Sequence, residues 1–258
     1  MVRLLLNHVP TSVVIVGMML VCGLVGWMIS FLFKRYLPKF LLVQDPHDAR
    51  ESIHLTSVLC ALLLTFMIVL LWEAYATLQE SVVSEAKTIG ALEIFSESLP
   101  PENDHEISAL IEDYVHVLIH DEWPQMEVGQ VSSRATELLL DLRYAIEAIE
   151  GKTPTLSAYR HEMLQDYNDV VFARNLRLDH LDSTIPDFFL FTILANLLGM
   201  YILMCLLNPS SHKRSHVFFL ILTSMMLGLN FSFLVVLDYP FSGELSITNT
   251  PLTHIHFD

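Results

Sequence analysis

The chain has 258 residues, of which 53% are hydrophobic and 17% are charged, and its formal net charge is −15. So apolar a composition is unusual for a water-soluble domain, and the apolar residues are gathered into long runs. The acidic balance also disfavours nucleic acid as a partner, because both molecules carry negative charge. We therefore predict an integral membrane protein that contacts the lipid bilayer and does not bind nucleic acid.

Four apolar runs are long enough to cross a hydrocarbon core of about 30 Å, which needs roughly 20 residues of helix. These runs cover residues 9–33, 53–75, 187–207 and 216–237. The first run ends in Lys34-Arg35 rather than at a small-residue cleavage site, so we interpret it as a span and not as a signal peptide. The predicted fold is all-α, with four transmembrane helices in two pairs.

The pairs of spans flank a long polar segment. Residues 1–75 hold the first two spans and a short basic loop at 34–52, and residues 187–258 hold the last two spans and a short C-terminal tail. Residues 76–186 are predicted to form an extramembrane domain. This domain holds 21 of the 29 Asp and Glu residues but 7 of the 14 Lys and Arg residues. Such a surface attracts cations, or it is a solvated face that keeps the helices soluble.

Basic residues indicate which side of the membrane the domain occupies. With four spans, the domain and both termini lie on one side and the two short loops on the other. The tail after Leu237 carries no Lys or Arg, and the N-terminal tail carries one, Arg3. The short loops carry six, at Lys34, Arg35, Lys39, Arg50, Lys213 and Arg214. Because short cytoplasmic loops are enriched in Lys and Arg, we predict an extracytoplasmic domain.

The second span is predicted to continue as a helix into the domain. No proline or turn cluster interrupts the chain from Ile53 until Pro100. A helix over residues 53–98 would be roughly 70 Å long at about 1.5 Å per residue, and so would extend well beyond the bilayer. Residues spaced by four and three indicate its buried seam. These residues are Leu78, Val82, Glu85, Ile89, Leu92, Ser96 and Leu99.

Three further helices are predicted in the domain. The first begins after Asn103 or Asp104 and stops at Trp123-Pro124, because proline disfavours helix at the residue before it. The next begins near Ser132 or Ser133, and the last begins after Thr155 and leads towards the third span. Strand-like alternation is not sustained anywhere, so the domain is predicted to be helical.

Polar residues and glycines within the spans have two interpretations. Asn196, Asn230, Thr56 and Thr65 either form hydrogen bonds between helices or line a hydrated path. Glycines allow helices to approach closely. Close contacts are therefore predicted at Gly17, Gly23, Gly26 and Gly199.

One group of side chains has the spacing of metal ligands. Asp113, His116 and His120 fall at i, i+3 and i+7, so they share a helix face that could hold a divalent metal. The alternative is a solvated histidine pair on an acidic surface. The sequence contains no nucleotide-binding loop, no Ser-His-Asp pattern and no metalloprotease motif. We therefore predict neither an enzyme nor a bound cofactor.

Four short segments together resemble the bacterial bestrophin-like family of membrane proteins. They are Glu85–Gly90, Asp121–Pro124, Arg174–Leu178 and Asp238–Gly243, and their order and spacing carry the resemblance. Bestrophins are pentameric ion channels in which the second span lines the pore. The resemblance therefore implies a multi-pass protein of the bacterial inner membrane that forms a homo-oligomer, with a pentamer as the family example, and conducts inorganic ions. Two features differ: the pore-neck aromatics of bestrophins have no match, and bestrophins keep their soluble part in the cytoplasm.

Two functional hypotheses follow. The first is an oligomeric ion channel that favours cations, with its path around the second span. The residues predicted to line this path are Thr56, Thr65, Glu73, Glu80, Glu85, Asn196 and Asn230. The alternative is a membrane sensor or scaffold whose extramembrane helical bundle binds a ligand or partner.

Overall fold

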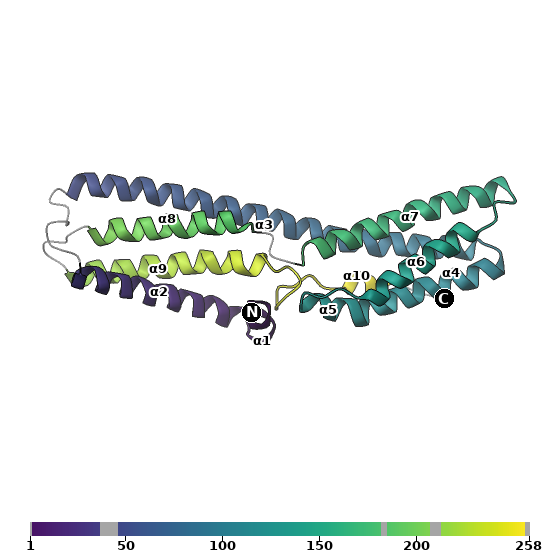
Figure 1. The fold of residues 1–258 in the computed structure, drawn as a ribbon, viewed down its shortest axis with the longest axis horizontal. Helices are drawn as coiled ribbons and strands as arrows, with labels where there is room; N and C mark the ends of the chain where they lie inside the picture. Colours follow the sequence, from purple (N-terminus) through teal and green to yellow (C-terminus); the bar gives the residue numbers. More distant parts are fainter. Residues whose placement is uncertain (1, 37–45, 182–184, 207–212, 256–258) are drawn as a thin grey trace. The chain divides into compact units, whose positions relative to one another are not determined.

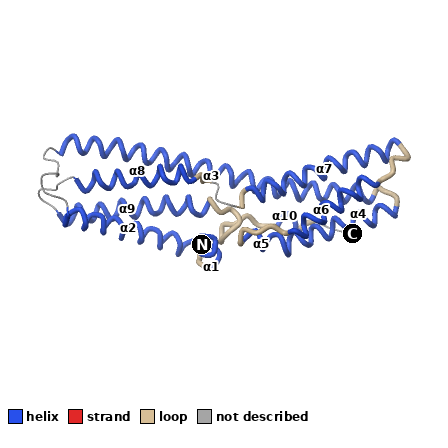
Figure 2. The backbone as a smooth tube through the Cα atoms, viewed as in Figure 1, coloured by secondary structure: helices blue, strands red, loops and turns tan. Residues whose placement is uncertain are grey.

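The computed structural model describes residues 2–36, 46–181, 185–206 and 213–255, and these ranges contain helices but no strand (Figures 1 and 2). The chain divides into two compact units. We call residues 8–73 and 183–238 the membrane unit, and residues 1–7, 74–182 and 239–258 the domain unit. The all-helical fold is thus confirmed for the described residues.

Four long helices make up the membrane unit. One of them, α3, is continuous over 52 residues and also contributes its C-terminal half to the domain unit. The helices are α2 (Thr11–Tyr36), α3 (Pro46–Glu97), α8 (Asp187–Leu206) and α9 (Lys213–Leu237). Three of them contain stretches long and apolar enough to cross a membrane, namely Thr11–Leu32, Glu51–Glu97 and Val217–Leu237. In α8 the apolar stretch is shorter, Phe188–Met204.

The α2 and α9 helices lie side by side and approach each other closely (Figure 1). A Cβ atom placed on Gly228 would lie 2.9 Å from the Cβ atom of Cys22 and 3.0 Å from the carbonyl oxygen of Met18. A Cβ atom on Gly26 would overlap the hydroxyl of Ser224. Close contact at small residues is how membrane helices gain packing energy, because lipid competes for larger apolar surfaces.

The glycine predictions are thus partly correct. Gly23 joins Gly26 in the α2–α9 contact, since its Cβ position lies 3.0 Å from Met225. Gly17 and Gly199 were predicted to pack in the same way, but no atom of the described chain lies within 4 Å of their Cβ positions. Glycine spacing alone does not show which face of a helix meets its neighbour.

A second contact region joins α3 to α8 and α9. Its core comprises Cys60, Leu64, Met67, Leu71, Ile193 and Leu234. The α3 residues of this core are again spaced by four and three, so the seam predicted for the domain also has a counterpart within the membrane span.

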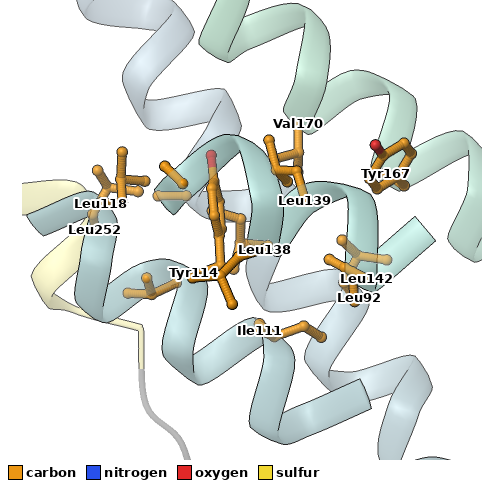
Figure 3. Packing of buried hydrophobic residues seen from close by; sticks show 14 of the residues in the cluster. Leu92, Ile111, Tyr114, Leu118, Leu138, Leu139, Leu142, Tyr167, Val170 and Leu252 are labelled. Carbon is orange, nitrogen blue, oxygen red and sulfur yellow. The ribbon is translucent and has the colours of Figure 1, made fainter. Parts of the chain in front are cut away.

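The domain unit is a helical bundle around the C-terminal half of α3. Its helices are α4 (Pro101–Val117), η2 (Leu118–Glu122), α5 (Trp123–Glu127), α6 (Ser133–Ala148) and α7 (Pro154–Asp179), with short helices α1 (Val2–His8) and α10 (Thr250–Thr253) from the chain ends. Tyr114 lies in the core with leucines of α6 and Val170 of α7 (Figure 3). All seven residues of the predicted α3 seam are buried, at 7% exposure or less.

The predicted end of a helix at Trp123-Pro124 is wrong. Trp123 has helical angles, φ −60° and ψ −49°, and the chain continues into α5 with Pro124 in its first turn. A proline is tolerated there because the first-turn N–H groups need no helical acceptor. The wide five-residue turn of η2 precedes it and supplies the transition.

Both chain ends join the domain unit, although sequence reasoning grouped them with the spans. The Asn7 side chain donates to the carbonyl oxygen of Glu127 at 2.9 Å and accepts from the Gly243 N–H at 2.9 Å. Ser242 donates to the same Glu127 oxygen at 3.2 Å. Gly243 has φ +86°, a conformation that other residues rarely adopt. Asn7, Ser242 and Gly243 are therefore fixed together at the end of α5.

Candidate functional site

Four charged side chains meet in the interior of the domain unit. Glu85 comes from α3, Glu122 from η2, and Arg174 and Arg177 from α7. Glu85, Glu122 and Arg177 are 0% exposed, and Arg174 is 5% exposed. We call these four residues the buried charge cluster. Because an isolated charge is costly to remove from water, each member requires a partner inside the domain.

Arg177 and Glu85 form the most buried pair. The Nε and Nη2 atoms of Arg177 donate to Oε2 and Oε1 of Glu85 at 2.8 and 2.7 Å. This two-point contact fixes the orientation of both groups. The Tyr114 hydroxyl donates to Oε1 of Glu85 at 3.3 Å, and the guanidinium lies 5.2 Å from the centre of the Trp123 ring. Helices α3, α4 and α7 are therefore joined at one carboxylate.

Arg174 and Glu122 form the second pair. The Nε atom of Arg174 lies 3.1 Å from each Glu122 oxygen, and its Nη2 atom donates to Oε2 at 2.6 Å. The same Nη2 atom donates to the carbonyl oxygen of Ser132 and to the Thr136 hydroxyl, at 3.3 and 3.0 Å. A contact of 3.5 Å between Arg177 and Glu122 links the two pairs. The cluster thus connects α6 as well.

The cluster balances two acids against two bases. Burial raises the pKa of the Glu85 carboxyl, and the charge and hydrogen bonds of Arg177 oppose this rise. For Arg177, burial acts to lower the pKa, but the charges of Glu85, Tyr114 and Glu122 and the hydrogen bond to Glu85 together outweigh it and the pKa is raised, so the guanidinium stays charged. Burial, followed by the charge of Glu85, raises the pKa of Tyr114, which therefore remains a neutral donor. We call this buried arrangement of paired charges the clamp; its only solvent exposure is the 5% of Arg174.

The wide turn of η2 positions Glu122 in this clamp. Leu118, Glu122 and Met126 are all buried, although their spacing of four residues drifts by about 40° per step in a regular α-helix. A five-residue turn absorbs the drift and keeps the three side chains on the core face. Met126 then contacts Arg177, whose Nη1 atom lies 3.3 Å from the sulfur.

The residues predicted to line an ion path on α3 occupy different faces of that helix. At about 100° per residue, Glu73 and Glu80 share one face, and both are exposed. Thr65 is exposed but about 80° away from that face, and Thr56 is about 100° away. Glu85 lies on the opposite, buried face, in the charge cluster. The structure therefore brings together Glu73 and Glu80 but not the other three.

The predicted polar residues of the spans form local contacts. The Thr56 hydroxyl donates to the carbonyl oxygen of Ser52 at 2.8 Å, and the Asn230 amide donates to that of Met226 at 2.9 Å. Both bonds remain within one helix, as is common for such side chains. Asn196 is half-buried on α8. Their role in an ion path stays a prediction.

The structure does not support the three-ligand metal site. The rings of His116 and His120 lie 4.6 Å apart, centre to centre, so the pair exists. Asp113, however, borders a cleft of about 650 Å³ together with Glu106 of α4 and Asp141 of α6. Within the described ranges, no three His, Cys, Asp or Glu side chains are arranged to hold a metal ion.

Sequence reasoning missed the buried charge cluster, although the signals were present. Glu85 interrupts an apolar seam, and Arg174 and Arg177 lie on the buried face of α7 with Val170. A charged residue on a buried seam requires an opposite charge from another helix, and that requirement could have linked them. Sequence alone does not show which acid meets which base.

The four segments that carry the family resemblance converge on this region of the domain unit. They supply Glu85, Glu122 and Trp123, the two arginines, and Phe241, whose ring packs edge-on against Trp123 at 6.0 Å. A sequence profile of the Bestrophin-like domain matches residues 49–252, which is most of the chain. No curated protein and no solved structure matches. The chain belongs to the bestrophin-like family of membrane proteins.

Proposed function

We propose that the protein is an oligomeric ion channel of the bacterial inner membrane, in which α2, α3, α8 and α9 of each subunit cross the bilayer. Membership of the bestrophin-like family supports ion conduction at the family level. The α8 helix has 20 residues, or about 30 Å at about 1.5 Å per residue, which suffices for a fourth span. The homo-oligomer, with a pentamer as the family example, belongs to this proposal.

The observation that carries the proposal is the exposed face of α3. Phe66, Glu73, Glu80 and Lys87 follow one another at seven-residue intervals and are all exposed. The opposite seam of the helix is buried in both units. One face of α3 is thus buried against its own chain and the opposite face is exposed. The exposed face is available to pack against the α3 helices of other subunits around a symmetry axis.

The exposed face changes character along its length. Leu59, Leu62 and Phe66 make it apolar in the span, whereas Glu73 near the end of the span and Glu80 beyond it make it acidic. Repeated around an axis, these carboxylates would raise the local concentration of cations. We propose that Glu73 and Glu80 select for cations, that Thr65, Asn196 and Asn230 have secondary contacts with the path, and that Glu85 serves the clamp instead.

Liposome flux tests the proposal directly. With purified protein in liposomes under a salt gradient, we expect a cation-selective reversal potential in the wild type. Glu80→Gln should move that potential towards zero, because one carboxylate per subunit is lost from the path. Glu162→Gln removes the same charge from an exposed position of α7 and should leave the potential unchanged. The absence of conductance under every ionic and voltage condition, with a monomeric particle, would favour the sensor or scaffold alternative.

The extracytoplasmic position of the domain is a second part of the proposal, supported by the basic residues of the short loops. A membrane-impermeant maleimide applied to intact cells tests it. We expect labelling of Glu162→Cys in the domain and no labelling of Lys39→Cys in the first loop. The native cysteines lie in the predicted spans and give the background. Labelling of Lys39→Cys alone would place the domain in the cytoplasm.

A further inference from the structure

A second buried acid in the domain unit is Glu93 of α3, which is not paired with an arginine of the described chain as Glu85 is. Glu93 is 8% exposed, and its Oε2 atom is buried and has no hydrogen-bond partner among the described residues. The Ser108 hydroxyl of α4 lies near the same carboxyl. A buried carboxylate with an unsatisfied oxygen is costly, because the ionised form loses its hydration.

The charges around Glu93 make its ionised form still less favourable. Glu97 of α3 and Asp104 and Glu112 of α4 are the charged groups with the largest effect on it, and all three are acidic. Glu93 borders a cleft of about 600 Å³, and Lys87 and His254 border this cleft as well. Neither forms an ion pair with Glu93 in the part of the chain that the structure describes. Like charges nearby and the lack of a base both favour a neutral carboxyl.

The hydrogen-bond geometry indicates where a proton would lie. Ser96 donates to the carbonyl oxygen of Glu93 at 2.7 Å, which uses its single hydroxyl hydrogen. The Ser96 and Ser108 oxygens are 2.7 Å apart, so Ser108 must donate in that contact. Ser108 then has no hydrogen left for Glu93, and Asp104 lies farther off at 3.3 Å. Neither serine hydroxyl therefore has a hydrogen left to stabilise an ionised Glu93 carboxylate, and this favours the protonated form.

We propose that Glu93 is a proton-binding site, protonated in the folded protein over a pH range in which exposed glutamates are ionised. The binding step transfers one proton from solvent to the carboxylate and changes no other bond. Release of the proton leaves an unpaired charge between α3 and α4, where the two serine hydroxyls meet. The proposal concerns the domain alone and does not depend on ion conduction.

The proton makes domain stability depend on pH. Burial raises the pKa of Glu93 above its usual value of 4.5, and the three neighbouring carboxylates add to the rise. Because the pKa is higher in the folded than in the unfolded state, this contribution to stability is complete below pH 4.5 and is lost as the pH rises through the folded-state pKa.

Infrared spectroscopy of the full-length protein in detergent tests the site. At a pH where exposed carboxyls are ionised, we expect the wild type to retain a C=O stretching band of a protonated carboxylic acid. Glu93→Gln should lose that band, and Glu162→Gln, which changes an exposed acid of α7, should retain it. An unchanged band in Glu93→Gln, or no such band in the wild type, would overturn the proposal.

Thermal unfolding provides a second measurement. The side-chain amide that Glu93→Gln introduces is neutral at every pH. We therefore expect this variant to fold. Its unfolding temperature should fall less steeply than that of the wild type as the pH rises. The unfolding temperature of the wild type should depend on sodium, calcium or a chelator no more than that of Glu93→Gln does. A cation-dependent midpoint in the wild type alone would identify a bound metal cation instead of a proton and would also overturn the proposal.

Discussion

Replacing Arg177 by methionine is expected to lower the free energy of unfolding of the domain unit by about 3–5 kcal/mol, the usual cost of leaving a buried charge without its partner. Methionine keeps much of the side-chain volume, so the loss comes from Glu85, which retains only the Tyr114 hydroxyl bond. Chemical unfolding in detergent, followed by the fluorescence of Trp123 beside the guanidinium, measures the change.

Two further variants make this test specific. Arg143→Met removes an exposed arginine that pairs with Glu147 on the surface of α6, and should have little effect. The double variant Arg177→Met with Glu85→Met removes both charges and should recover most of the loss, because an apolar pair of similar volume often replaces a buried ion pair without penalty. Equal effects of Arg177→Met and Arg143→Met would show that the clamp contributes nothing to stability.

In the membrane unit, Gly228→Leu is expected to separate α2 from α9 and to cost about 1–3 kcal/mol, as overpacking typically does. The Cβ position of Gly228 meets the backbone of Met18 and Met19 at 3.0 Å, and backbone atoms cannot rotate away as a side chain can. Cys22 lies in the same contact, so its reaction with a small maleimide should become faster.

Gly17→Leu is the matched control for this prediction. Gly17 lies on α2, in the same span, but no described atom lies within 4 Å of its Cβ position. The variant adds the same side chain and should change neither the unfolding temperature nor the reactivity of Cys22. If both variants behaved alike in the detergent-solubilised protein, the close contact of α2 with α9 would not determine the stability of this unit.

Helix positions were largely predictable, because local patterns determine them. The α3 seam from Leu78 to Leu99 was assigned residue by residue from its spacing, and Ser132 was recognised as a start of α6, where its hydroxyl accepts from the Ala135 N–H at 3.3 Å. These features depend on neighbours in sequence. The η2 turn was not predictable in the same way, because the spacing of Leu118 and Glu122 indicates a buried face only once their partners are known.

Partners between helices were less predictable, and the errors share this cause. Glu85 was assigned to an ion path because it follows Glu73 and Glu80 on the same helix, yet it faces Arg177. Gly17 and Gly26 were both predicted to lie in a contact between helices, yet of these two only Gly26 meets α9. In both cases the residue type and the helical spacing were interpreted correctly. The spacing did not show which neighbour that face of the helix meets, and the neighbour decided the role.

The five-residue turn at Leu118–Glu122 makes this part of the chain tolerant of a change in length. A π turn is an α turn that holds one additional residue, and its removal restores ordinary helical winding. A family member one residue shorter between Tyr114 and Glu122 can therefore keep the same acid opposite the same arginine. Alignments of this family should place a single-residue gap at the half-buried or exposed positions Ile119 and His120, and not at the glutamate.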